Sequence, residues 1–287
     1  MENRKGRLFL VMLFATAMTL ITTGAFAGID QGSVDKCKTC HEEVVNKFMA
    51  GAHHGKVWSK SKGATTGSCE SCHGPGDKHM EDNLKTSIIT FGKHSSQSSE
   101  DQNKQCLNCH QKSPGLAMWK LGAHKRNDVS CASCHSGHGD KPQPAGPETC
   151  FKCHTTMKGQ MQKLSHHPVV EGKVSCNDCH NVHGTTSHGQ IKGDNLNQLC
   201  YKCHQDKRGP FMWEHAPVEE NCSTCHKPHG SNHAALLVKP TPLLCKDCHE
   251  GPHGQVRAAG KFVGRACLNC HSKIHGSNGP AGKDFTR

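Results

Sequence analysis

The chain has 287 residues, of which 20 are cysteine and 25 histidine, whereas only 33% are hydrophobic and 5% aromatic. So little apolar material excludes a large conventional core, and by composition alone the chain resembles a disordered polypeptide. The formal net charge of +11 at pH 7 would suit a nucleic-acid-binding protein, but the cysteine pattern described below explains it differently.

Residues 1–27 match a secretory signal peptide that is cleaved from the mature protein. A basic start at residues 4–7 precedes an apolar run at residues 8–17, and the triplet A-F-A at residues 25–27 fits an A-x-A cleavage site. We therefore expect an exported chain that begins at Gly28, with retention of the apolar run as an anchor as the alternative. No later stretch of the sequence is apolar enough to span a bilayer.

A C-x-x-C-H motif occurs ten times, and its copies, numbered 1 to 10 in chain order, use all 20 cysteines. Two thiols three residues apart can form thioethers to one edge of a porphyrin, and the histidine that follows can bind the iron from one face. A single pair of cysteines could instead belong to a redox dithiol or a zinc knuckle. Neither of these needs a histidine after every pair, so the sequence predicts ten covalently bound haem c groups.

The cysteines predicted to form thioethers are Cys37, Cys40, Cys69, Cys72, Cys106, Cys109, Cys131, Cys134, Cys150, Cys153, Cys176, Cys179, Cys200, Cys203, Cys222, Cys225, Cys245, Cys248, Cys267 and Cys270. The histidines predicted to bind iron from the proximal side are His41, His73, His110, His135, His154, His180, His204, His226, His249 and His271. With about 26 mature residues per motif, we expect the porphyrins to supply most of the buried apolar mass.

The first motif is followed by apolar residues four apart, such as Val44 and Phe48, which predict a short amphipathic helix ending at Gly51. Residues 80–104 form the longest stretch without a motif. They are polar and serine-rich, and we expect a surface loop around a small apolar contact at residues 88–91.

From Cys131 onward the motifs alternate between two types, and two motifs recur in about 45 residues. Such repeats stack on their neighbours. The predicted fold is therefore a multihaem cytochrome c of mostly irregular loops and short α-helices, with little or no β-structure. We expect an elongated haem array of two pentahaem halves, residues 28–160 and 161–287, with a loop at 137–147 and a short helix at 157–164.

The sixth iron ligand decides between a carrier and an enzyme, because iron bound by two histidines has no free position for a substrate. A histidine just after a motif cannot reach the other face of the same iron, so we expect distal ligands to come from neighbouring motifs. Aligning GAHHG with GAHKR, and HHPV with HAPV, selects the first histidine of each doublet. The candidate distal ligands are His53, His79, His124, His138, His166, His183, His215, His229, His253 and His275.

The remaining histidines are interpreted as surface or neighbouring residues, namely His54, His94, His167, His188 and His233. Methionine is the competing axial ligand. Six methionines follow the signal segment. Met49, Met118 and Met212 lie near histidines that explain the ligation better, and they are interpreted as packing residues. Histidine ligation on both faces of each iron predicts low reduction potentials for the haems.

The excess of basic over acidic residues is consistent with the binding of ten haems. Removal of residues 1–27 leaves a formal charge of +9. Ten oxidised haems, each with two propionates and one net positive ferric centre, add about −10. We therefore interpret the basic residues as partners of propionates and expect no nucleic-acid binding.

The motifs GAHHGK and CHGPGDKH, CLNCH followed by W-x-x-G-x-H, and HxPV followed by CxxCHxxHG occur in this order. Together they resemble the MtrA/DmsE family of periplasmic decahaem cytochromes across essentially the whole mature chain. The resemblance implies a single-file haem wire that threads an outer-membrane β-barrel porin. The wire would carry electrons from a periplasmic donor, such as an inner-membrane quinol-linked cytochrome, to an extracellular cytochrome or mineral. Other members imply delivery to a DMSO-type reductase.

We therefore expect an electron-transfer protein of the periplasm, associated with the outer membrane through a barrel partner, rather than an enzyme. One alternative is a soluble shuttle to a terminal reductase of the DMSO or nitrite type, which would be recovered only from the soluble periplasm. Another is a multihaem reductase with one open haem, which would bind carbon monoxide. A third is a haem filament, which microscopy would show.

Overall fold

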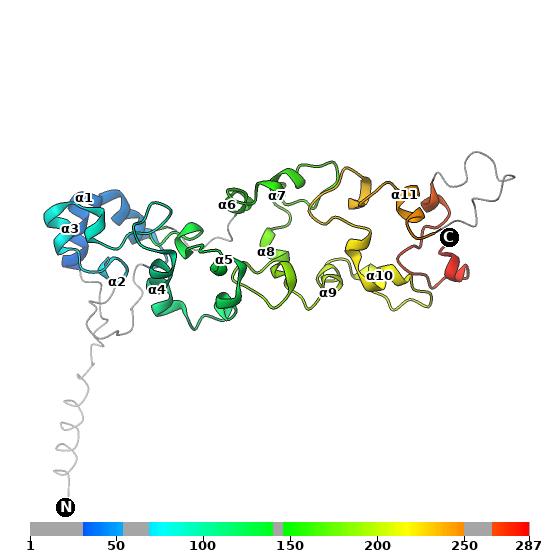
Figure 1. Ribbon diagram of the computed structural model, residues 1–287, viewed down its shortest axis with the longest axis horizontal. Coiled ribbons are helices and arrows are strands. Elements are labelled where there is room, and N and C mark those ends of the chain that lie inside the picture. Colours follow the sequence, from blue (N-terminus) through cyan, green and yellow to red (C-terminus); the bar gives the residue numbers. More distant parts are fainter. Residues whose placement is uncertain (1–30, 54–68, 140–145, 250–265, 287) are drawn as a thin grey trace, which may run out of the picture. The chain divides into compact units, whose positions relative to one another are not determined.

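The computed structural model describes residues 31–53, 69–139, 146–249 and 266–286, so the expected signal segment lies outside the described residues. Short helices joined by turns and irregular segments make up these parts of the chain (Figure 1). They contain isolated antiparallel bridges but no strand. The predicted fold of short helices and loops is thereby confirmed.

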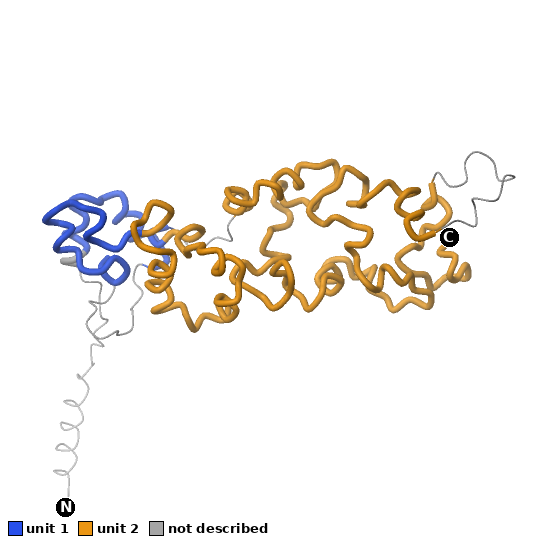
Figure 2. Tube along the Cα trace, viewed as in Figure 1, with its two compact units in different colours: residues 1–90, 137–141 blue, residues 91–136, 142–287 orange. Residues whose placement is uncertain are grey.

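The described chain divides into two compact units (Figure 2). Unit 1 comprises residues 1–90 and 137–141, and unit 2 comprises residues 91–136 and 142–287. The boundary expected near residue 160 lies inside unit 2, and the arrangement in two pentahaem halves stays a prediction.

Unit 1 contains α1 (Gln31–Ala50), α2 (Glu70–His73), α3 (Asp77–Asp82) and the 3-10 turn η1 (Lys85–Ser87). The helix expected after motif 1 is confirmed as the second part of α1, where Val45 is buried and Val44 is exposed. The helix bends at His41, whose φ of −120° and ψ of 42° are not helical. The bend lies at the motif histidine itself.

Unit 2 contains the remaining helices, which are α4 (Ser99–His110), α5 (Ala123–Arg126), α6 (Pro147–Phe151), α7 (Thr155–Gln160), α8 (Cys176–Cys179), α9 (Leu196–Cys200), α10 (Ala216–Glu220) and α11 (Thr241–Lys246). Its 3-10 turns are η2 (Pro114–Leu116), η3 (Trp119–Leu121), η4 (Cys131–Ser133), η5 (His188–Gln190), η6 (Gln205–Lys207), η7 (Cys222–Thr224), η8 (Ala234–Leu236), η9 (Cys267–Asn269) and η10 (Gly282–Asp284).

Helix α4 corrects part of the loop expected at residues 80–104, because it begins inside that stretch at Ser99. The hydroxyl of Ser98 accepts a hydrogen bond from the backbone N–H of Asp101 at 3.1 Å and so caps the helix. The helix expected at residues 157–164 is present as α7, which begins and ends earlier.

Antiparallel bridges connect segments from different repeats of unit 2. Ser165 pairs with Ser231, and Trp213 pairs with Ser277. In each bridge, the first residue lies two positions before a histidine, His167 or His215, and the second lies two positions after a histidine, His229 or His275. Beside the first bridge, two segments of the chain approach so closely that a Cβ on Gly230 would lie 1.9 Å from the backbone oxygen of Gln160. Only glycine fits there.

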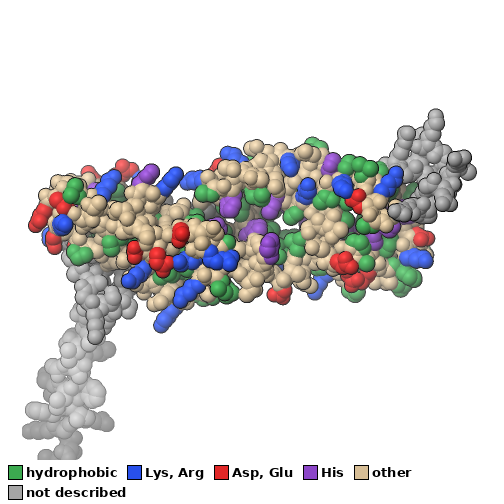
Figure 3. Space-filling model, in the orientation of Figure 1, with side chains coloured by type: hydrophobic (Ala, Val, Ile, Leu, Met, Phe, Trp, Pro, Cys, Tyr) green, Lys and Arg blue, Asp and Glu red, His purple; other side chains and the backbone are tan. Residues whose placement is uncertain are grey.

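The polypeptide itself provides little core. One cluster joins the buried side chains of Phe151, Met161 and Val169, with Met157 and Val174 packed against it. On the face shown in Figure 3, charged side chains are spread over the surface, while histidines gather in hollows of unit 2. Among the described residues, no helix has the length and apolar character needed to cross a membrane.

Candidate haem-binding site

Each described motif folds as a single helical turn. The backbone N–H of the histidine donates to the carbonyl of the first cysteine, for example from His204 to Cys200 at 2.9 Å and from His226 to Cys222 at 3.0 Å. One turn places residues i, i+3 and i+4 on the same face. Both thiols and the imidazole of a motif therefore project together, as attachment of one porphyrin requires.

The cysteines of the motifs form no disulfide and share one pattern of exposure. The first cysteine of every motif is half-buried, whereas the second is exposed in all motifs except 6 and 8. Burial beside Cys69 raises the pKa of the Cys37 thiol to about 11. The thiols are thus available for thioether formation and do not pair as disulfides.

Among the described residues, imidazole rings from different motifs or repeats lie close together in eight pairs. Their ring centroids are between 5.8 and 6.3 Å apart. The pairs are His41–His79, His73–His138, His135–His183, His124–His154, His180–His229, His167–His204, His226–His275 and His215–His249. In every pair, one member follows a C-x-x-C and the other does not.

This spacing fits an iron ion between the rings. A metal–nitrogen distance of about 2.0 Å on each side, with about 1.1 Å from each nitrogen to its ring centre, separates the two centres by roughly 6 Å. Six pairs are also close to parallel, with interplanar angles of 9° to 23°. The pairs at His154 and His204 are tilted by 82° and 61°.

Burial keeps many of these imidazoles neutral, which is the form that binds a metal. Desolvation is the main cause that lowers the pKa of six of them, namely His73, His138, His183, His215, His229 and His275. A neighbouring histidine lowers the pKa further in each case.

Backbone carbonyls fix the tautomer of the motif histidines in motifs 2, 6, 8 and 10. A carbonyl can only accept, so Nδ1 carries the proton and Nε2 keeps a free lone pair for a metal. The Nδ1 atoms donate to the carbonyls of residues 9 to 16 positions later: His73 to Ile89 (2.7 Å), His180 to Gly189 (2.8 Å), His226 to Ala235 (2.8 Å) and His271 to Asp284 (2.5 Å).

A second group of histidines, outside the motifs, follows a different rule. Its members donate from Nδ1 to the carbonyl directly before another candidate distal ligand: His53 to Gly137 (3.0 Å), His124 to Val182 (2.9 Å) and His167 to Pro228 (2.6 Å). The buried Nδ1 of His215 faces the carbonyl of Ile274 in the same way, but outside hydrogen-bond geometry. The orientation of one ligand is therefore coupled to the segment that carries the next.

The structure corrects the expectation for His166. The ring beside His204 belongs to His167, while His166 forms an ion pair with Glu171 at 2.9 Å. That hydrogen bond raises the pKa of His166. The two aligned segments differ in structure. Helix α10 begins at Ala216 with Pro217 in its first turn, whereas the Val169 N–H donates to the His167 carbonyl at 2.7 Å in a tight turn.

Counting from the antiparallel bridge selects His167 rather than His166. His167 lies two residues after Ser165, just as His215 lies two residues after Trp213. Among the other predicted ligands, His253 lies outside the described residues. His53 stays a predicted ligand, and its Nδ1 bond to Gly137 places it in the same group as His124 and His167.

Consecutive motifs are neighbours within each unit. The thiols of the first cysteines lie within hydrogen-bonding reach in the pairs Cys37–Cys69, Cys106–Cys131, Cys150–Cys176, Cys200–Cys222 and Cys245–Cys267. The second cysteines are near neighbours in the pairs Cys134–Cys153, Cys179–Cys203 and Cys225–Cys248. Two kinds of junction thus alternate along unit 2.

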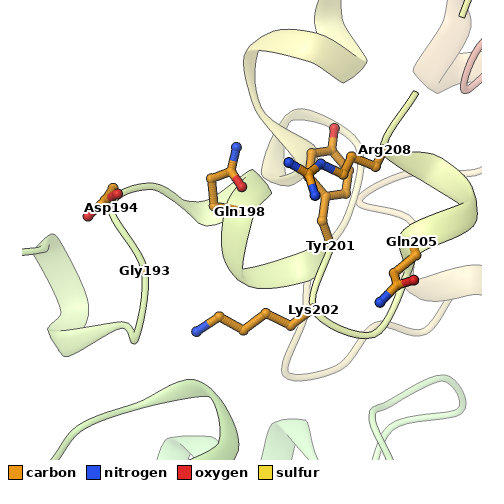
Figure 4. A pocket seen from close by; sticks show the side chains of 7 residues that line it. All are labelled: Gly193, Asp194, Gln198, Tyr201, Lys202, Gln205 and Arg208. Carbon is orange, nitrogen blue, oxygen red and sulfur yellow. The ribbon is translucent and has the colours of Figure 1, made fainter. Parts of the chain in front are cut away.

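A hollow of about 460 Å³ lies beside motif 7 (Figure 4). It is lined by Gly193, Asp194, Gln198, Tyr201, Lys202, Gln205 and Arg208. Two cations and one carboxylate line it, so its surplus positive charge favours a group that carries carboxylates, as haem propionates do.

Comparisons with known proteins agree with this geometry. Family models match at residues 166–209 and 215–254 (Doubled CXXCH motif), 69–146 (Cytochrome c-type protein NrfB-like) and 139–181 (Cytochrome c554 and c-prime). The chain is also 42% identical over 272 residues to multiheme cytochrome MtrA of Shewanella baltica (strain OS185). The aligned region covers 88% of this chain and 81% of that protein.

Proposed function

The chain belongs to the MtrA family of multihaem c-type cytochromes, and we propose that it conducts electrons along a series of haems ligated by two histidines each. It carries ten covalently bound haem c groups and takes part in electron transfer. Each haem supplies an iron that exchanges single electrons reversibly. The polypeptide attaches, orients and shields these groups.

The observation that carries the proposal is the set of eight imidazole pairs with ring centroids 5.8 to 6.3 Å apart. We assign the motif histidine of each pair as proximal ligand and its partner as distal ligand. An iron ligated on both faces has no open position, and this favours a carrier over a reductase. Nδ1 hydrogen bonds to carbonyls hold the imidazoles in the tautomer that leaves Nε2 facing the iron.

The order of the motifs supports conduction from one end of a unit to the other. In unit 2, junctions at which the first cysteines meet alternate with junctions at which the second cysteines are near neighbours, from motif 3 to motif 10. Covalent attachment carries this order over to the cofactors. We propose that motifs adjacent in sequence hold cofactors adjacent in space.

We propose that the protein works in the periplasm. There it would accept electrons from an inner-membrane quinol-linked cytochrome and pass them toward an outer-membrane β-barrel porin and an extracellular cytochrome or acceptor. Family membership and the signal-peptide pattern support this placement. Co-purification of a tagged chain with a barrel from detergent-solubilised outer membrane is the test. Recovery only from the soluble periplasm would leave the shuttle interpretation.

The ligation itself is tested on the purified holoprotein. Haem content should be ten per chain by the pyridine haemochromogen assay, electron paramagnetic resonance should show low-spin ferric iron only, and the native reduced protein should bind no carbon monoxide. Binding of one equivalent of carbon monoxide would mark an open iron and support a reductase instead.

A further inference from the structure

Two buried asparagines occupy equivalent places, three residues before the first cysteine of motif 3 and of motif 7. Asn103 in α4 is 1% exposed, and Asn197 in α9 is 7% exposed. A buried amide group is costly unless its oxygen and its N–H groups find partners. Asn103 finds them at the start of motif 4 and in the segment before it, and Asn197 finds them at the start of motif 8 and in the segment before it.

The oxygen of the Asn103 side chain accepts a hydrogen bond from the backbone N–H of Cys131 at 2.7 Å. Its Nδ2 faces the carbonyl of Val129 at 3.5 Å, the limit of a hydrogen bond. Helix α4 therefore contacts η4, the turn of motif 4, through this one side chain as well as through general packing.

Asn197 repeats the arrangement with shorter contacts. Its oxygen accepts from the backbone N–H of Cys222 at 2.8 Å, and its Nδ2 donates to the carbonyls of Val218 and Glu219, each at 2.9 Å. One side chain thus holds the end of α10 and the start of motif 8 against α9.

The residue held in each case is the cysteine whose thiol contacts the preceding motif, Cys131 beside Cys106 and Cys222 beside Cys200. Those cysteines are also the points at which the cofactor is attached. A shift of the backbone N–H of Cys222 therefore moves the thioether anchor.

Motifs 1, 5 and 9 show that the asparagine is not needed to form the turn of a motif. They have Val34, Pro147 and Pro242 at the equivalent position, and these side chains cannot accept a hydrogen bond. The thiol contact to the next motif is nevertheless present in all three. The asparagines add a restraint at two junctions only.

We propose that Asn103 and Asn197 are positioning residues that fix the relative placement of the two haem groups attached at motifs 3 and 4 and at motifs 7 and 8. The inference rests on the haem attachment proposed above, but not on the barrel partner or on the direction of electron flow.

The test replaces Asn197 by Leu, which has the same branched arrangement of heavy atoms and no hydrogen-bonding group, in the complete holoprotein. Circular dichroism in the Soret region reports coupling between neighbouring haems. We expect ten haems per chain and an altered Soret couplet. Hydrogen exchange of the Cys222 amide should become about 3- to 10-fold faster, as loss of one hydrogen bond predicts. Asn197→Asp, which keeps the acceptor oxygen, should retain more of the wild-type couplet.

Asn195→Ala is the matched control, because Asn195 caps the same helix by accepting from the Gln198 N–H at 3.0 Å but does not touch motif 8. It should lower the Tm and leave the couplet unchanged. A couplet equally unchanged in N197L would overturn the proposal and leave Asn197 a merely stabilising residue. If N197L loses a haem, N103L with S98A as control decides in the same way. Fewer than ten haems in the unmodified protein would instead contradict the proposed function.

Discussion

His124 donates a hydrogen bond from Nδ1 to the carbonyl of Val182 at 2.9 Å, although its own ring lies beside His154. Val182 directly precedes His183, whose ring lies beside His135. The segment that carries the proposed distal ligand of motif 4 therefore also orients the proposed distal ligand of motif 5. Neighbouring haem sites are mechanically linked through the polypeptide, and a change at one should be felt at the other.

The assignment of His167 predicts different effects for the two histidines of the doublet. His167→Ala removes the ring beside His204, so one iron should become high-spin and bind about one equivalent of carbon monoxide. His166→Ala removes only the ion pair with Glu171 and should leave every iron low-spin. Electron paramagnetic resonance and carbon monoxide titration of both variants provide the measurement. The reverse result would restore the alignment-based choice of His166.

Close packing at the antiparallel bridge predicts a steric effect at Gly230. Alanine there would place its Cβ 1.9 Å from the Gln160 oxygen, and the backbone shift should cost about 1–3 kcal/mol of unfolding free energy. Gly159→Ala in α7 is the control, since a Cβ there meets nothing within 4 Å and should stabilise the helix by up to about 1 kcal/mol. Urea unfolding followed in the Soret band compares them, and equal stability would contradict the prediction.

None of the methionines is expected to bind iron, and Met212, interpreted from the sequence as a packing residue, is exposed in the structure. Met161 is 6% exposed and packs with Phe151 and Val169, so Met161→Ala should lower the unfolding free energy by about 2–5 kcal/mol. Met212 is 74% exposed, and Met212→Ala should change it by less than about 0.5 kcal/mol. Neither the unmodified protein nor either variant should show an absorption band near 695 nm. Such a band would indicate methionine ligation instead.

The carboxylate of Asp82 predicts a pH-dependent stability of unit 1. Hydrogen bonds from the Ser87 hydroxyl (2.6 Å) and the Leu84 N–H (2.8 Å) lower the pKa of Asp82. A lowered pKa contributes stability above the ordinary value near 4, and this contribution is lost as the pH falls through the folded pKa.

Asp82→Asn should therefore lower the Tm at pH 7, and the gap to the unmodified protein should close in acid. The same turn presents the Leu84 carbonyl to Nδ1 of His79 at 3.0 Å, so the spectrum of the motif 1 haem should shift at pH 7 as well. Ser87→Ala, which removes one of the two donors, should have an intermediate effect on Tm. A Tm difference that is independent of pH would exclude this account of Asp82.

Features that depend on adjacent residues were predictable from the sequence. The turn of each motif follows from C-x-x-C-H itself, and the second part of α1 follows from apolar residues four apart. The start of α4 at Ser99 was missed, although Ser98 and Asp101 carry a recognisable capping pattern. The serine-rich composition of the surrounding stretch concealed it.

Features that depend on distant parts of the chain could not be predicted in detail. The sequence indicated that His215 and His229 serve other motifs, and the structure places them beside His249 and His180. It did not indicate which motifs, because many separations along the chain permit a contact. The roles of Asn103 and Asn197 were likewise invisible, since each depends on the backbone N–H of a cysteine in a later motif.

The pairing of His135 with His183, and of His180 with His229, has a consequence for biosynthesis. A chain delivered from its N-terminus presents motifs 4 and 6 before the residues that complete their coordination have emerged. Motifs 5, 7 and 9 find their partners already present. We therefore expect a chain interrupted just after motif 2, 4, 6 or 8 to hold a five-coordinate iron at that motif, because the histidine paired with it in the folded protein lies further along the chain.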